Sequence, residues 1–267
     1  MQTDPAWNRP KESMSSDTLI SKNQPADFVL AERERIRREY LRREREIDPE
    51  FYGWQRPAEQ FTIATRNRAA RVMLRNTGLL PLTGKCLEVG CGAGGWLSEM
   101  RELGLPESRL HGIDLDPGRA DRARSAFPQA DIRVGDAVEL PWPDDSFRLV
   151  IASTLFTSVL DSRVRQLIAN EIQRVLSPSG ALLWYDFAYN NPRNANVRGV
   201  KRSEIRRLFP MLTGRIRSVT LFPPLARVLA PKSESLVRLL EGIPVLRTHL
   251  LAVLCMNDRA SESAQRL

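Results

Sequence analysis

A glycine-rich turn, EVGCGAGGW at residues 88–96, follows a short apolar run and precedes a helical pattern. Glycines allow a tight turn and let a ligand approach the backbone closely, because no Cβ lies in the way. The helix that follows offers unpaired N–H groups to an anionic part of a ligand. Gly90, Gly92 and Gly95 also satisfy the dinucleotide pattern G-x-G-x-x-G, so these glycines alone leave two classes of cofactor open.

Two further acidic residues follow the next two apolar runs. Asp114 ends the run RLHGID, 20 residues after Gly94, the spacing of a carboxylate that accepts hydrogen bonds from ribose hydroxyls. Asp136 follows the run DIRVG, where a carboxylate can accept from the exocyclic amine of adenine. With Glu88, these acids favour a ligand that combines an amine, a ribose and an adenine over one with two phosphates. The alternative is that Asp114 and Asp136 cap turns or helices.

These motifs, in this order, resemble those of the class I S-adenosylmethionine-dependent methyltransferases, in particular a branch of small bacterial enzymes with a GDAxxLP block. The similarity covers LEVGCGAGGW, GIDLDP, GDAVELPWPDDSFRLV and EIQRVLSPSGALLWYDF, roughly residues 84–190. Arg148 departs from the family, which usually has aspartate after the Ser-Phe pair. The resemblance implies S-adenosyl-L-methionine as cofactor. It places Glu88 near the methionyl amine, Gly90, Gly92 and Gly94 along the methionyl group, Asp114 at the ribose, Leu115 against the adenine, and Asp136 with Ala137 at its amine edge.

Methyl transfer from a sulfonium is an in-line displacement that needs alignment and desolvation more than a protein nucleophile. A general base helps only for some acceptors, by about 10²- to 10⁴-fold. In an open α/β sheet the reacting centre lies beyond the carboxyl ends of the strands. We therefore expect Asp186 as base or substrate anchor and Tyr185 beside it, although Asp186 also fits a turn cap and Tyr185 the core. Four residues are the candidates for substrate contacts: Thr154, Thr157, Asn190 and Asn191.

The elements that must position these residues follow from the alternation of apolar runs with helical stretches after Lys85. This alternation predicts an α/β fold, a Rossmann-like, mostly parallel seven-stranded sheet with helices on both faces. Before it, residues 31–48 carry seven Arg and six acidic residues at helical spacing and predict an exposed, solvated helix. Apolar spacing from Ala58 to Asn76 predicts a second helix. The aromatic residues Phe51, Tyr52 and Trp54 precede it and fit either a lid or the core.

We divide the chain accordingly. Residues 1–50 form a flexible leader and the charged helix, residues 51–83 a helical lid or lead-in, and residues 84–256 the methyltransferase domain. Within that domain, residues 193–247 form a cap and helical insertion on the acceptor side, and residues 257–267 are a tail.

The net charge of +8 is unevenly distributed. Residues 84–160 hold 8 basic and 12 acidic residues, whereas residues 193–250 hold 12 basic and 3 acidic ones. An acidic segment suits a sulfonium cofactor, and a basic segment suits an anionic acceptor or surface. We therefore expect a small-molecule, sugar or lipid-linked acceptor with anionic character. The insertion fits contact with that acceptor or with an anionic membrane, and the alternative is a helical cap that only closes the edge of the core.

Other features limit the class of protein. Three cysteines and the absence of an export signal favour a reducing, cytoplasmic setting at or near the inner membrane face. Only two histidines are present, so we expect no protein-bound metal. RNA methylation is an alternative that the basic charge raises, but motifs of nucleic-acid methyltransferases are missing and nucleic acid is disfavoured. A non-catalytic cofactor-binding scaffold is another alternative, and an NAD-dependent oxidoreductase is a weaker one.

Overall fold

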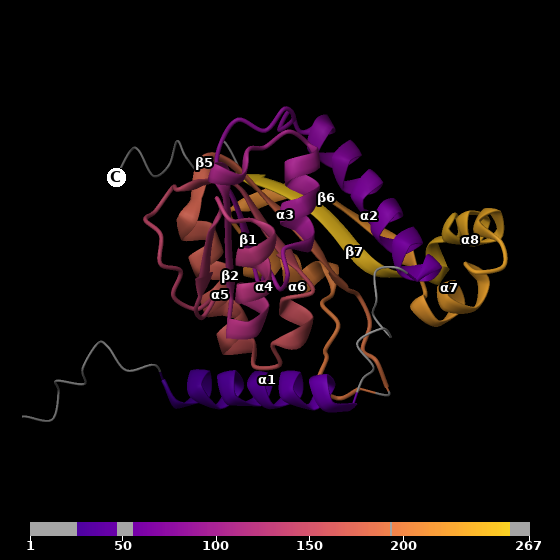
Figure 1. Cartoon of the computed structure of the whole chain (residues 1–267), viewed down its shortest axis with the longest axis horizontal. Coiled ribbons are helices and arrows are strands. Elements are labelled where there is room, and N and C mark those ends of the chain that lie inside the picture. Colours follow the sequence, from indigo (N-terminus) through magenta and orange to yellow (C-terminus); the bar gives the residue numbers. More distant parts are fainter. Residues whose placement is uncertain (1–25, 47–55, 193, 257–267) are drawn as a thin grey trace, which may run out of the picture.

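The computed structural model describes residues 26–46, 56–192 and 194–256. Within these ranges one seven-stranded sheet has the order β3-β2-β1-β4-β5-β7-β6 (Figure 1). Its strands are β1 (Cys86–Val89), β2 (Leu110–Asp114), β3 (Asp131–Val134), β4 (Phe147–Ser153), β5 (Leu176–Phe187), β6 (Leu212–Leu221) and β7 (Arg247–Met256). The aromatic group Phe51, Tyr52 and Trp54 and the two chain ends lie outside the described residues.

Eight α-helices accompany the sheet in this part of the chain. They are α1 (Asp27–Glu46), α2 (Pro57–Asn76), α3 (Gly95–Glu102), α4 (Pro117–Ala126), α5 (Ser162–Val175), α6 (Arg202–Leu208), α7 (Pro223–Leu229) and α8 (Glu234–Glu241). Three short 3₁₀ helices cover Glu107–Arg109, Phe156–Ser158 and Pro244–Leu246. The predicted mostly parallel sheet with helices on both faces is confirmed.

The five strands β1 to β5 are parallel, so their carboxyl ends meet at one edge of the sheet. Strand β7 runs antiparallel to both β5 and β6. Because Phe187 at the end of β5 pairs with His249 near the start of β7, the segment that leads into β7 also lies at this carboxyl edge. Helices α7 and α8 belong to that segment and stand at the side of the molecule (Figure 1).

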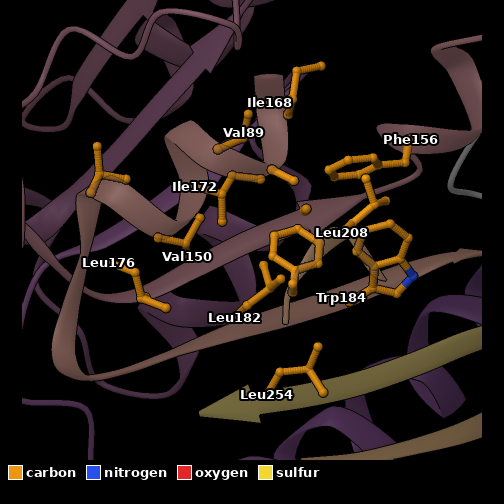
Figure 2. Close-up of a cluster of buried hydrophobic side chains, with 14 of the residues drawn as sticks. Val89, Val150, Phe156, Ile168, Ile172, Leu176, Leu182, Trp184, Leu208 and Leu254 are labelled. Carbon is orange, nitrogen blue, oxygen red and sulfur yellow. The ribbon is translucent and has the colours of Figure 1, made fainter. Parts of the chain in front are cut away.

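Alternate residues of each strand supply two separate cores. Val150 and Trp184 face the side covered by α5 and α6, whereas Ile151 and Tyr185 face the side covered by α2, α3 and α4. Figure 2 shows the first core, in which the aromatic and aliphatic side chains of β4 and β5 meet those of α5.

Helix α5 shows how the sequence sets this packing. Its N-cap Asp161 accepts a hydrogen bond from the Arg163 amide at 2.8 Å. Val164, Ile168 and Ile172 follow at four-residue spacing and are all buried, as the inner face of an amphipathic helix requires.

The starts of β5 and α6 are set by contacts with neighbouring strands. Strand β5 begins at Leu176, immediately after α5, because Leu176 pairs with Phe147 before an irregularity shifts the register. Within the predicted cap at residues 193–247, the first helix begins only at Arg202. The preceding chain follows the end of β5 instead, since the Val200 amide donates to the Phe187 carbonyl at 2.8 Å.

Candidate active site

The glycine turn adopts a conformation that side chains disfavour. Gly90, Gly92 and Gly94 have φ values of 72°, 54° and 85° between the end of β1 and the start of α3. At Gly94 a Cβ would also lie 2.5 Å from the Phe127 ring, so a side chain there would clash. The turn is therefore built for glycine, and the N-terminus of α3 opens directly behind it.

A hydrogen bond connects Asp114 to this turn. Its carboxylate accepts from the Gly92 amide at 2.8 Å and from the Asp116 amide at 2.9 Å. Asp116 in turn caps α4 by accepting from the Arg119 amide at 2.8 Å. Asp114 thus caps the turn after β2, as the alternative interpretation of this residue allowed, and also joins the ends of β1 and β2, while the helix cap is Asp116.

Asp136 follows β3 and has two partners. One carboxylate oxygen accepts from the Val138 amide at 3.1 Å, and the other accepts from the Arg33 guanidinium of α1 at 2.8 Å. The residue predicted to meet the adenine amine therefore holds a side chain of the N-terminal helix.

A cavity of about 60 Å³ brings the predicted residues together. Five of them line it, from the ends of three neighbouring strands: Gly90, Asp114, Leu115, Asp136 and Ala137. Its opposite wall is α1, through Val29, Glu32, Arg33, Ile36 and Tyr40. Pockets for small ligands usually measure about 300 to 1,000 Å³. The space left beneath α1 is thus several times smaller than a nucleoside-sized ligand requires.

Helix α1 is held against this edge by polar contacts. Glu32 accepts from the Leu160 amide and from Arg35, whose guanidinium also donates to the Ser158 carbonyl. Burial alone would raise the pKa of Glu32, but these hydrogen bonds outweigh it and lower the pKa. Figure 1 shows α1 lying across the base of the sheet and its helices.

The far end of α1 meets the segment after β5. Glu39 accepts from the Asn196 side chain at 2.7 Å and from Arg42 and Arg43. The expectation of a solvated helix is wrong at Glu32 and Glu39, which are only 6% exposed. Sequence analysis missed Arg33 and Glu39 because their partners lie 103 and 157 positions away, and a charged repeat does not reveal long-range partners.

Glu88 is buried beneath the turn and does not line the cavity. Its carboxyl accepts from the Leu97 amide at 3.3 Å in the first turn of α3. Burial raises the pKa of Glu88 to about 8, against the opposing effect of the Arg66 guanidinium and these backbone donors. The carboxyl is therefore largely protonated at neutral pH. Gly92 and Gly94 also lie outside the cavity lining.

Tyr185 and Asp186, adjacent in β5, point to opposite faces. The Asp186 carboxylate accepts from the Thr157 amide at 3.0 Å and from the Phe187 amide at 2.9 Å, and burial raises its pKa to about 7. The Tyr185 hydroxyl meets the Thr220 hydroxyl at 2.9 Å beneath α2, and burial raises its pKa to about 12. The structure thus does not bring these two candidates together.

The other candidate substrate contacts are spread over the same edge. Thr157 is buried and donates from its hydroxyl to the Arg198 carbonyl at 3.0 Å, while Thr154 is exposed and has a φ of 50°. Asn190 is exposed and accepts from the Gly199 amide at 2.9 Å, and Asn191 beside it is also exposed. None of these four lines the cavity.

The donor set of the cavity fits an adenosine better than a metal. Its acidic residues Asp114 and Asp136 stand at the ends of neighbouring strands, and the described ranges contain no cluster of three or more side chains able to hold a metal ion. None of the helices in the described part of the chain combines the length and apolar character needed to cross a bilayer.

Comparison with known proteins matches this geometry to a family. Residues 86–180, from the start of β1 into β5, match the family model described as "Methyltransferase domain". This part of the chain is similar to the class I S-adenosylmethionine-dependent methyltransferases. S-adenosyl-L-methionine is the methyl donor of this family.

The relatives of this chain are distant. It is 32% identical over 110 residues to a demethylmenaquinone methyltransferase of Listeria monocytogenes, which covers 39% of this chain and 45% of the relative. It is 29% identical over 114 residues to the sterol 4-C-methyltransferase strm-1 of Caenorhabditis elegans, covering 40% of this chain and 32% of the relative. The chain thus spans less than half the length of either relative.

Solved structures share the fold at low identity. Geranyl diphosphate C-methyltransferase from Streptomyces coelicolor superposes with a TM-score of 0.54 at 15% identity, over 71% of this chain and 80% of that one. The PH0226 protein from Pyrococcus horikoshii superposes with a TM-score of 0.52 at 16% identity, over 82% and 99%. At these identities the similarity concerns the fold.

Proposed function

We propose that this protein transfers a methyl group from S-adenosyl-L-methionine to a lipid-linked small molecule that carries negative charge. The observation that supports the cofactor half is the cavity in which Gly90, Asp114 and Asp136 converge from three strand ends. The bound cofactor supplies an electrophilic methyl group, and the protein's own residues bind, orient and exclude water.

The residues that we propose to hold the cofactor still have free lone pairs or open space for it. Asp114 would hold the ribose with the lone pairs left free by the Gly92 and Asp116 amides. Leu115 and Ala137 would pack against the adenine, and Asp136 would accept from its amine. Gly90, Gly92 and Gly94 would leave room along the methionyl group, with Glu88 fixing the first turn of α3 behind it.

Cofactor entry requires movement of α1. The lining residues suit the cofactor, but the cavity beneath α1 is too small for it. In addition, the Arg33 guanidinium already donates a hydrogen bond to the Asp136 carboxylate. We propose that α1 moves outward when the cofactor binds. One of the contacts that hold α1, the ion pair of Arg33 with Asp136, is partly exposed on both sides, so breaking that pair costs little, about 1 kcal/mol or less.

Asp186 is better suited to position the acceptor site than to act as a base. Both of its oxygens accept backbone N–H groups, which tie the loop after β4 to the end of β5. We propose that it anchors Thr157, with Thr154, Asn190 and Asn191 along the acceptor path. Tyr185 would support the same edge from below through Thr220.

The acceptor class rests on the second half of the chain. Residues 193–250 hold 12 basic and 3 acidic residues, and apolar side chains accompany them in α7 and α8. The similar proteins include a demethylmenaquinone, a sterol and a geranyl diphosphate methyltransferase. An acceptor with an apolar chain and an anionic group would match both features.

Two measurements test this function. Titration calorimetry with S-adenosylhomocysteine and, separately, NADH should give binding only for the former. Incubation with methyl-labelled S-adenosylmethionine and cell extract, split into organic, aqueous and RNA fractions, should place the label in the organic fraction. Label in RNA would replace the proposed acceptor, and cofactor binding without any labelled product would support a non-catalytic scaffold.

A further inference from the structure

Helices α7 and α8 expose an unusual share of the protein's apolar surface. Of thirteen large apolar residues exposed in the described ranges, six lie between residues 222 and 245: Phe222, Val228, Leu236, Leu239, Ile243 and Val245. Leu239 and Val245 are 70% and 81% exposed. Single exposed apolar residues are ordinary, whereas a concentration of them marks an interaction site. We call these six residues the apolar tip.

The tip is a fixed part of the molecule. Behind it, Phe61 of α2 packs with Leu221, Ala226 and Val237 in a small core of its own. Arg227 of α7 pairs with Glu59 of α2 at 3.2 Å. The exposed side chains are therefore presented by packed helices, and their exposure belongs to the folded state.

Helix α8 is apolar on two sides. Val237 and Leu240 face the small core, while Leu236 and Leu239, three residues apart, share an outward face. A water-exposed helix usually carries polar residues on its outer face. The outer apolar side of α8 thus lacks a partner among the described residues.

The charge around the tip identifies the kind of partner. Lys232 is exposed on the same segment, Arg238 is exposed and pairs with Glu234 at 2.6 Å, and Arg215 and Arg217 are exposed on the neighbouring edge strand β6. Apolar side chains with exposed cations on the same segment and on the neighbouring strand fit the boundary of an anionic bilayer, where the chains enter and the cations meet lipid headgroups. A second copy would instead bring two segments with 12 basic and 3 acidic residues each together.

The position of the apolar tip relates membrane contact to the proposed reaction. The segment that holds α7 and α8 enters β7 beside the end of β5, at the sheet edge where the acceptor would react. Figure 1 shows both helices standing out from the sheet. We propose that the apolar tip docks this methyltransferase on an anionic membrane surface, so that a lipid-linked acceptor reaches the carboxyl edge of the sheet. The acceptor part of this inference rests on the proposed function.

Vesicle flotation tests the docking without cofactor or acceptor. The full chain is mixed at low salt with vesicles of phosphatidylcholine alone or with an equal part of phosphatidylglycerol. Retention is expected on the anionic vesicles only. The double variant Leu239→Ser/Val245→Ser should lower the bound fraction at least about tenfold, because two apolar side chains no longer enter the bilayer. Leu41→Ser/Val134→Ser removes two comparably typed exposed residues elsewhere, 49% and 43% exposed, and should leave retention unchanged.

Charge is tested separately. Lys232→Glu should weaken retention about fivefold or more and make it less sensitive to salt, whereas Arg122→Glu on α4 should have little effect. Absence of retention, or equal retention of the tip variant and wild type, overturns the proposal. So does a dimer in sedimentation velocity that Leu239→Ser/Val245→Ser dissociates, because the tip would then join two copies.

Binding of S-adenosylhomocysteine to the same preparations separates the two proposals. The tip variant should bind it as wild type does and show an unchanged melting temperature. Loss of cofactor binding in wild type would overturn the proposed function and leave the vesicle result standing. Failure on vesicles with normal cofactor binding would overturn the docking alone.

Discussion

Helix α1 and the pair α7–α8 both lie at the carboxyl edge of the sheet, but they are attached by different forces. Helix α1 is held by charged side chains, among them Arg33 on Asp136 and Glu32 on the Leu160 amide, and by Val29, which packs in the first core. Helices α7 and α8 are held by an apolar core that includes Phe61 and Val237. Partly exposed ion pairs contribute little, whereas buried apolar contacts contribute several kcal/mol. The difference favours a movable cover on the cofactor side and a fixed platform on the acceptor side.

The strongest test of this difference removes the apolar attachment. Phe61→Ala should lower the free energy of unfolding by about 3 kcal/mol, because it deletes a buried ring between α2 and the tip. Amide exchange in α7 and α8 should rise with it. Urea denaturation and hydrogen exchange measure the two effects. Val72→Ala, at an exposed position of the same helix, should change stability by less than about 0.5 kcal/mol.

The pKa values of two buried glutamates, Glu39 of α1 and Glu88 of β1, are shifted in opposite directions. At α1, hydrogen bonds from Arg42 and Arg43 lower the pKa of Glu39, so its stabilising contribution is present at neutral pH and is lost as the pH falls below 4.5. Glu88, inside the domain, has a pKa raised to about 8, so its contribution to stability is lost as the pH rises from 4.5 through about 8.

The substitution Glu88→Gln tests the pH dependence expected from the raised pKa of Glu88. The variant should already be the more stable protein at pH 6, where Glu88 ionises in the unfolded chain but not in the folded one, and its advantage should grow by about 3 kcal/mol up to pH 9, where wild type must ionise a buried carboxyl. Calorimetric melting at both pH values measures this. An equal loss of stability at pH 6 and pH 9 would mean that Glu88 is ionised and stabilising in the folded protein.

The parts of the site that the sequence could predict are those set by neighbouring strands. Asp114 and Asp136 end β2 and β3, and the order of parallel strands brings their carboxylates to one cavity. Arg33 could not be predicted, because its contact with Asp136 depends on where a separate helix docks, and helical charge spacing describes only contacts within the helix. The segment that carries the tip was predicted as a helical insertion, but which of its leucines stay exposed depends on how α2 packs.

On the cofactor side, Asp114→Asn should weaken S-adenosylhomocysteine binding about tenfold, about 1.4 kcal/mol. The substitution removes a charged acceptor of the ribose hydroxyls, and such hydrogen bonds exceed neutral ones in strength. Calorimetry measures the affinity, and Asp121→Asn, an exposed change of the same kind on α4, is the control. Vesicle retention should be the same for both variants. A joint loss of cofactor and vesicle binding would contradict the independence of the two regions.

The smallest expected effect is also the most direct test of α1 as a movable cover. If the docked helix excludes the cofactor, weakening its attachment raises the fraction of protein able to bind. Arg33→Ala removes a partly exposed pair worth about 0.2 to 1 kcal/mol, so S-adenosylhomocysteine should bind up to about fivefold tighter. Arg37→Ala removes an exposed charge from the same helix and should leave the affinity unchanged. Weaker binding in Arg33→Ala alone would show instead that α1 holds the cofactor in place, and the polar attachment would then belong to the bound state.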